Sequence, residues 1–118
     1  MYEMTKADWK LYRERLPGWQ EAHMEKLARE YIELLSGSGK GSDKWWALEE
    51  RIRQDKKSPG VIVTLRKSDA PQQLLSLLIN DVISEEDLNG FSEDLRDRIL
   101  YLHKSWMDDS KEDDEPED

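Results

Sequence analysis

The sequence holds few side chains that could catalyse a reaction or bind a metal. Its 118 residues include two histidines, His23 and His103, and no cysteine, which removes disulfides, thiolate catalysis and cysteine metal sites. The histidines form neither an H-x-x-x-H nor an H-E-x-x-H pair, the spacings that place two ligands on one helical face. No serine lies in a G-x-S-x-G turn. We therefore predict a protein that is not an enzyme and that has no metal and no cofactor.

A run of small residues at positions 37–42 (GSGKGS) superficially resembles a phosphate-binding loop. That motif reads G-x-x-x-x-G-K-[ST] and joins a strand to a helix. Here Leu34 stands at the first glycine position, Gly41 follows the lysine, and the preceding residues have helical periodicity. We therefore interpret the run as a flexible linker, with nucleotide binding as a minor alternative.

A basic segment follows between residues 51 and 67. Its cationic residues are Arg51, Arg53, Lys56, Lys57, Arg66 and Lys67, and its one acid is Asp55. The simplest interpretation is a solvated helix end, where cations complement the helix dipole. Two alternatives remain open: the segment could contact nucleic-acid phosphates, or it could hold an acidic tail that folds back over it.

Most of the net charge of −9 comes from such a tail. Residues 108–118 hold eight acids and one lysine, or −7, which leaves residues 1–107 at −2. A segment of this composition buries too little apolar surface to offset the entropy of ordering it. We predict a helical domain over residues 1–107 and a disordered acidic tail over 108–118. The nearly neutral domain argues against a protein that mimics nucleic acid.

The first half of the chain predicts three helices. Thr5 and Asp8 have the spacing of an N-cap and its N3 acid, and we expect Pro17 to end or kink the helix that they begin. A second helix runs from Trp19 to Leu35. A third begins at Ser42 or Asp43, reaches Lys57 and has a buried stripe of Trp45, Leu48 and Ile52.

The second half is organised around the most apolar stretch, residues 74–83 (LLSLLINDVI), which we predict to form the central core helix. Ser68 and Asp69 start this helix, with Pro71 in its first turn. Residues 84–87 (SEED) form a capping box for a short helix. Residues 92–94 (SED) start the last helix, whose buried stripe is Leu95, Ile99, Leu102 and Trp106. Residues 61–65 (VIVTL) fit a short helix slightly better than a strand, and a strand would pair with its equivalent in a second copy.

These elements predict an all-α fold, a compact bundle of five to six helices. The N-terminus lacks the apolar stretch of a signal peptide, and no apolar run approaches the roughly 20 residues that span a bilayer. We therefore expect a cytoplasmic protein that does not enter a membrane.

Seven segments carry a likeness to known sequences: residues 5–9 (TKADW), 12–17 (YRERLP), 30–35 (EYIELL), 55–61 (DKKSPGV), 66–69 (RKSD), 87–88 (DL) and 91–95 (FSEDL). On these motifs the chain resembles, over about residues 4–105, a group of small uncharacterised bacterial proteins. Some members of that group carry a multidrug-transporter name, which the lack of a membrane-spanning stretch contradicts. The resemblance implies a bacterial origin and no activity, ligand or catalytic residue.

Aromatic side chains provide the leading hypothesis about function. Trp46 lies about 100° from Trp45 on its helix, so it either seals an edge of the core or anchors a partner. Leu100 and Tyr101 lie off the stripe of the last helix. We predict a protein–protein interaction or adaptor protein that binds an unidentified partner, or a second copy, through an aromatic helix face at Trp46, Leu100 and Tyr101. The alternative is a nucleic-acid-associated regulator that uses residues 51–67 and is inhibited by its own tail.

Overall fold

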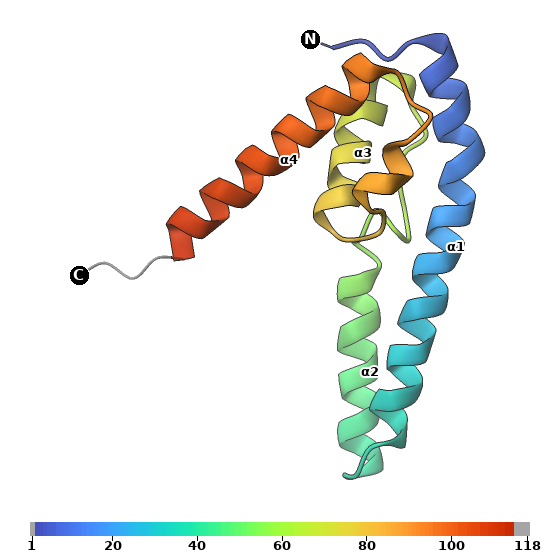
Figure 1. Ribbon diagram of the computed structural model, residues 1–118. Coiled ribbons are helices and arrows are strands. Elements are labelled where there is room, and N and C mark those ends of the chain that lie inside the picture. Colours follow the sequence, from blue (N-terminus) through green and yellow to red (C-terminus); the bar gives the residue numbers. More distant parts are fainter. Residues whose placement is uncertain (1, 115–118) are drawn as a thin grey trace.

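The computed structural model describes residues 2–114, with side chains as far as Ser110, and all regular structure in that range is helical (Figure 1). The elements are α1 (Lys6–Ser36), α2 (Gly41–Asp55), the 3-10 helix η1 (Lys67–Asp69), α3 (Ala70–Ile79), the 3-10 helix η2 (Glu85–Leu88) and α4 (Glu93–Asp114). The all-α prediction is confirmed. The predicted number of helices is too high, because the described range has four α-helices and its other two helical segments are single 3-10 turns.

Helix α1 begins where predicted but does not end at Pro17. The hydroxyl of Thr5 accepts a hydrogen bond from the Asp8 backbone N–H at 3.1 Å, and the helix then continues for 31 residues. Pro17 has no N–H, so the carbonyl one turn earlier receives no helical hydrogen bond from it. Buried residues on both sides of the proline, Leu16 and Leu27, keep the helix packed across this position. Tertiary packing therefore overrides the local preference.

Helix α3 is the centre of the core, as predicted. It begins at Ala70, directly after the predicted start at Ser68 and Asp69, and ends at Ile79, before the predicted end at Ile83. Asp81 then adopts a left-handed conformation (φ 57°) and turns the chain. Ile83 returns to the core beyond that turn. The core cluster lies entirely in one part of the molecule, which we call the head: the N-terminal half of α1, α3, η2 and the first turns of α4. Its buried members are Met4, Tyr12, Leu16, Ala70, Leu74, Leu75, Leu77, Leu78, Ile83, Leu88, Phe91, Leu95 and Ile99.

The loop between η2 and α4 is held against α1 by Arg15. Its guanidinium donates to the carbonyls of Asp87 and Asn89 and lies 5.4 Å from the centroid of the Phe91 ring. Gly90 adopts φ 98°, and a Cβ there would lie 2.7 Å from Arg15 Nη2. The predicted capping box at residues 84–87 is present, although it starts a 3-10 turn.

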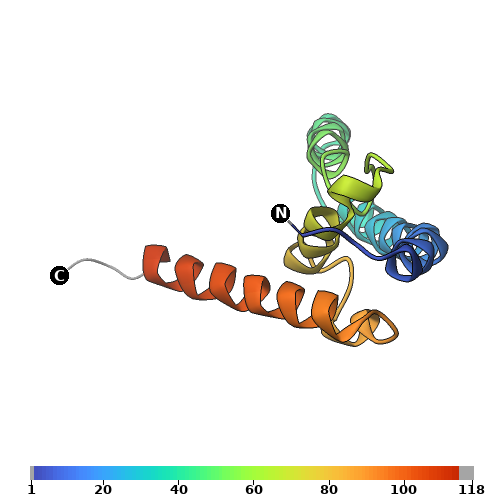
Figure 2. The ribbon, with the colours of Figure 1, turned by 90° about the horizontal axis from the view of Figure 1, so that it is seen from above.

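Two parts of the chain extend beyond the head. The C-terminal half of α1 and all of α2 form an antiparallel hairpin, here called the arm (residues 20–55), and α4 points away from it (Figures 1 and 2). The radius of gyration is 17.3 Å, against about 13.5 Å for a compact domain of this length. The expectation of a compact bundle is therefore wrong.

Two further boundaries differ from expectation. Residues 62–66 are neither helix nor strand; Gln73 donates a hydrogen bond to the carbonyl of Thr64 at 2.6 Å in this irregular segment. Helix α4 continues to Asp114, so the predicted start of the acidic tail at residue 108 falls within it. Residues 115–118 lie outside the described residues, and their disorder stays a prediction.

Two glycine replacements are expected to have opposite effects on stability. Gly18→Ala should raise the free energy of unfolding by about 0.5–1 kcal/mol, because this glycine is in a helix interior and its Cβ would have no neighbour within 4 Å. Gly60→Ala should lower it by about 1–3 kcal/mol, because the new methyl group overlaps the ring of His23. Urea unfolding followed by circular dichroism measures both. Equal effects of the two replacements would contradict this account of the Gly60 contact.

Candidate functional site

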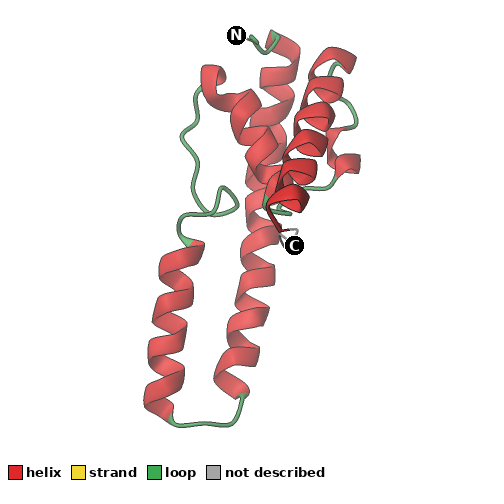
Figure 3. Cartoon of the chain, turned by 90° about the vertical axis from the view of Figure 1, so that its left-hand side faces the viewer, coloured by secondary structure: helices red, strands yellow, loops and turns green. Residues whose placement is uncertain are grey.

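The arm is held together by a polar seam between α1 and α2. The Tyr31 hydroxyl donates to Asp55, and Arg51 lies 3.2 Å from Glu30 and 3.6 Å from Asp55. The Arg51 guanidinium also lies 5.6 Å from the centroid of the Tyr31 ring. Desolvation, followed by the hydrogen bond to Asp55, raises the pKa of Tyr31 to about 12. These contacts place the two helices side by side over the length seen in Figure 3.

One side of the arm is polar. A cavity of about 380 Å³ lies there, lined by His23, Lys26, Leu27, Glu30, Arg51, Gln54, Asp55, Lys57, Ser58 and Asn80. Lys26 in α1 and Gln54 in α2 are each about a quarter-turn from the seam, in the same rotational sense. Because the helices are antiparallel, equal rotation from the seam leads to the same side of the hairpin, as their shared cavity shows.

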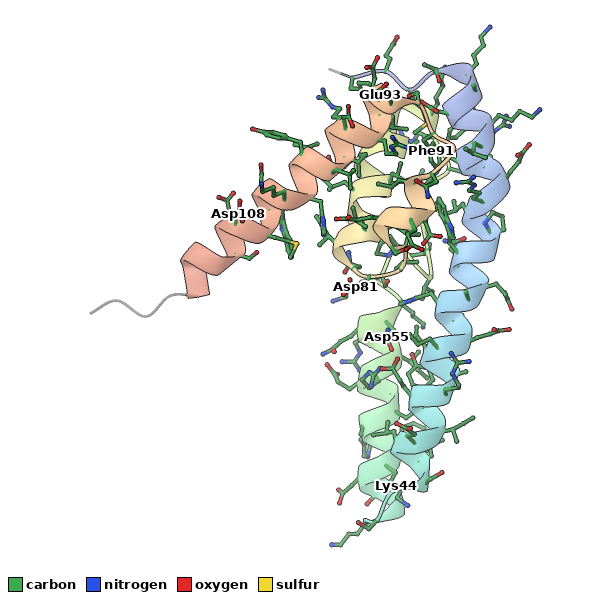
Figure 4. All side chains as sticks on the ribbon, viewed as in Figure 1. Lys44, Asp55, Asp81, Phe91, Glu93 and Asp108 are labelled. Atoms are coloured by element: carbon green, nitrogen blue, oxygen red, sulfur yellow. The ribbon has the colours of Figure 1, made fainter. Side chains whose placement is uncertain are left out.

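Rotation in the opposite sense leads to an apolar side. Met24 and Leu35 of α1, and Trp45 and Ile52 of α2, each lie about a quarter-turn from the seam in that sense. We call these four residues the apolar face. Trp46 and Ile32 lie next to this face, about half a turn from the seam on the outward sides of the two helices. The Trp45 and Trp46 rings meet edge to face at 4.8 Å. Figure 4 labels Lys44 and Asp55, which mark the free end of α2 and the end next to the head.

No part of the described chain covers this face. Trp45 is 60% exposed, Trp46 64% and Ile32 63%, and α2 has no buried residue. The predicted buried stripe on α2 is therefore wrong at Trp45 and Ile52, and Leu48 is only half-buried. Trp46 does not seal the core either. Periodicity correctly placed Trp45, Leu48 and Ile52 on one side of α2. They are not buried because the core lies in the head and does not extend along the arm.

The outer half of α4 has a second uncovered stripe. Leu95 and Ile99 are buried as predicted, whereas Leu102 is 36% and Trp106 46% exposed. The reason is length: α4 has 22 residues, about 33 Å, and its partner α3 has 10, about 15 Å. Tyr101 is 70% exposed, as predicted. Leu100 is partly buried against the core, so it is not the free contact residue that we expected.

The candidate contact residues do not form one site. Trp46 belongs to the arm and Tyr101 to α4, and these two elements diverge from the head (Figures 1 and 2). Met24, Leu35 and Ile32 were missed as contact residues because α1 alone reads as an ordinary core helix. The sequence signal that could have identified them is that α1 and α2 each have apolar residues to one side of the residues that join the two helices.

The three arginines of the basic segment pair with carboxylates, most of which lie outside the segment. Arg53 pairs with Glu49 and Glu50, and Arg66 pairs with Asp69. All three of these carboxylates, and Glu30 beside Arg51, lie outside residues 51–67 and were therefore absent from the local charge count. Within residues 51–67, the exposed cations that make no ion pair with a described residue are Lys56, Lys57 and Lys67. The six residues therefore do not present a free, continuous cationic patch.

Catalytic and metal chemistry find no further support in the geometry. Over the described residues, no three His, Asp or Glu side chains gather as metal ligands would. The His23 ring packs on the backbone of Gly60. Across those same residues, none of the helices combines the length and apolar composition needed to span a bilayer.

No family model matches the chain, and no curated protein or solved structure matches it. The candidate site is therefore assigned from the structure alone, and it is the apolar face of the arm.

Proposed function

We propose that this is a non-enzymatic interaction protein that binds another polypeptide through the apolar face of its arm. The supporting observation is that Met24, Leu35, Trp45 and Ile52 share one side of a hairpin that nothing in the described chain covers. With Trp46 and Ile32 they expose on the order of 600 Å² of large apolar side chain, about the largest patch usual on a monomer.

The shape of the face favours a polypeptide over a small ligand. The cavity nearest to it, lined by Glu49, Ile52, Arg53 and Lys56, holds about 170 Å³. Sites for small molecules are usually closed clefts of roughly 300–1,000 Å³. Tryptophan is among the residues that dominate binding energy at protein interfaces. A broad surface with two exposed tryptophans suits a helix or a helical hairpin as its partner.

The test is site-specific photo-crosslinking in the cells that produce the protein. A photoreactive amino acid at Trp46 should give crosslinked protein adducts, because this position borders the apolar face. The matched control is Gln54, which is exposed on the polar side of the same helix and should give few adducts. Equal labelling from both positions, or none from position 46, would contradict the proposal.

A further inference from the structure

We propose that the occupant of the apolar face is a second copy of this chain, packed antiparallel so that two arms form a four-helix bundle. The inference rests on the proposed function, since it names the partner of the same face. It is carried by three observations: the arm lacks a core of its own, its face is self-complementary, and the exposed area matches the needs of a dimer.

The arm buries too little apolar surface of its own to be stable without a covering polypeptide. Its helix α2 has 15 residues and no buried residue, and Leu27 is the one buried α1 residue in the described arm. A helix of this length is marginal in water unless an apolar face is packed. A polypeptide that covers the apolar face whenever the arm is folded must be present in at least the same amount as this chain. A second copy of the chain meets that requirement without any other gene product.

The face has the self-complementarity that a two-fold axis requires. Along α2 the midpoint between Trp45 and Ile52 falls at residues 48–49, and along α1 the midpoint between Met24 and Leu35 falls at residues 29–30. The contact of Arg51 with Glu30 places these midpoints within about one turn, 5.4 Å, along the arm. A single two-fold axis across the middle of the arm would therefore relate the face residues of both helices to those of the second copy.

Size and packing agree with this arrangement. The axis sets Trp45 of each copy over Ile52 of the other, and Met24 over Leu35. Ala28, exposed on α1 near the axis, lets the backbones approach to the 8–10 Å of packed helices. The four residues of the face, together with the neighbouring Trp46 and Ile32, expose about 1,200 Å² of large apolar side chain in two copies. When all six are covered, this area reaches the lower limit of a standard stable interface.

The first test measures mass in solution by light scattering and sedimentation over a range of protein concentrations. The full chain should be a dimer. Ile52→Glu and Trp45→Glu should each raise the dissociation constant at least tenfold, because each places a charge in the interface. Gln54→Glu on the polar side and Tyr101→Glu on α4 should leave it unchanged, and circular dichroism checks that every variant keeps its helices.

The second test maps the axis without disturbing the apolar face. The chain has no cysteine, so a single introduced cysteine reports one position. Glu49→Cys lies beside the proposed axis and should be joined to its equivalent in the second copy by a short bis-maleimide. Gln54→Cys lies on the polar side and away from the axis, and should remain uncrosslinked.

The outcomes separate this inference from the proposed function. A monomer at all concentrations overturns the inference, while crosslinks from position 46 to a different protein would leave the proposed function standing. A dimer that persists in both face variants and dissociates with Tyr101→Glu would place the contact on α4 and overturn the inference. Efficient crosslinking at Gln54→Cys but not at Glu49→Cys would overturn the antiparallel arrangement.

Discussion

Tyr12→Ala is expected to lower the free energy of unfolding by about 3–5 kcal/mol, as truncation of a buried aromatic residue does. Tyr12 is completely buried and its ring lies 6.0 Å from that of Trp9 and 6.5 Å from that of Trp19. Its hydroxyl also donates to Gln73 at 3.0 Å. The change removes both the ring and the link from α1 to α3. Urea unfolding followed by far-ultraviolet circular dichroism measures the loss.

Two controls separate packing from the hydroxyl. Tyr101→Ala removes an equal volume from a position that is 70% exposed, and should change stability by less than about 0.5 kcal/mol. Tyr12→Phe keeps the ring and should cost about 1 kcal/mol. A Tyr12→Ala loss no larger than that of Tyr101→Ala would show that the aromatic cluster is not the centre of the core.

The hydroxyl also makes stability depend on alkaline pH. Burial raises the pKa of Tyr12 from 10.0 to about 12. Between these values the unfolded chain loses the phenolic proton and the folded chain keeps it, so the unfolded state binds fewer protons and stability falls as pH rises. The contribution is complete below pH 10 and is lost toward pH 12. Tyr12→Phe should therefore show a smaller fall over that range than the unmodified protein.

Asp8→Ala is expected to lower the free energy of unfolding by about 2–4 kcal/mol, since hydrogen bonds to a charged group are worth more than neutral ones. Asp8 is 3% exposed. One of its oxygens accepts the backbone N–H of Ser92 at 2.8 Å and the other accepts the Ser92 hydroxyl. Ser92 immediately precedes α4, so the carboxylate of one helix anchors the start of another. Urea unfolding again gives the value.

A double-mutant cycle isolates this contact. Ser92→Ala and Asp8→Ala should each be destabilising, and the double variant should be less destabilised than the sum of the two, because each removes the same interaction. Asp97→Ala, at an exposed position of α4, is the matched control and should have little effect. Simple additivity of Asp8→Ala and Ser92→Ala would show that the contact carries no coupling energy.

Local sequence signals predicted much of the fold. The Thr5 cap, the capping box at residues 84–87 and the start of the central helix all form as expected. Each depends on hydrogen bonds or on a periodicity within a few residues, which the order of the amino acids alone specifies. The same reasoning failed at Pro17, because the energy that keeps α1 continuous comes from residues distant in sequence that pack on it.

The candidate site shows the same division. The order of the amino acids specifies which residues share a helical face: Trp45 with Ile52, and Leu95, Ile99, Leu102 and Trp106 along α4. Which of these faces are covered follows from the packing of the helices, since it depends on where the neighbouring helices end. Helix α3 stops after 10 residues, so the stripe of α4 is buried at its start and exposed beyond, and the head leaves the arm uncovered. Likewise Asp8 has the sequence signature of a local N3 acid, and folding assigns it Ser92, 84 positions away. Periodicity records the direction in which a side chain points, whereas burial requires a second element to be present in that direction.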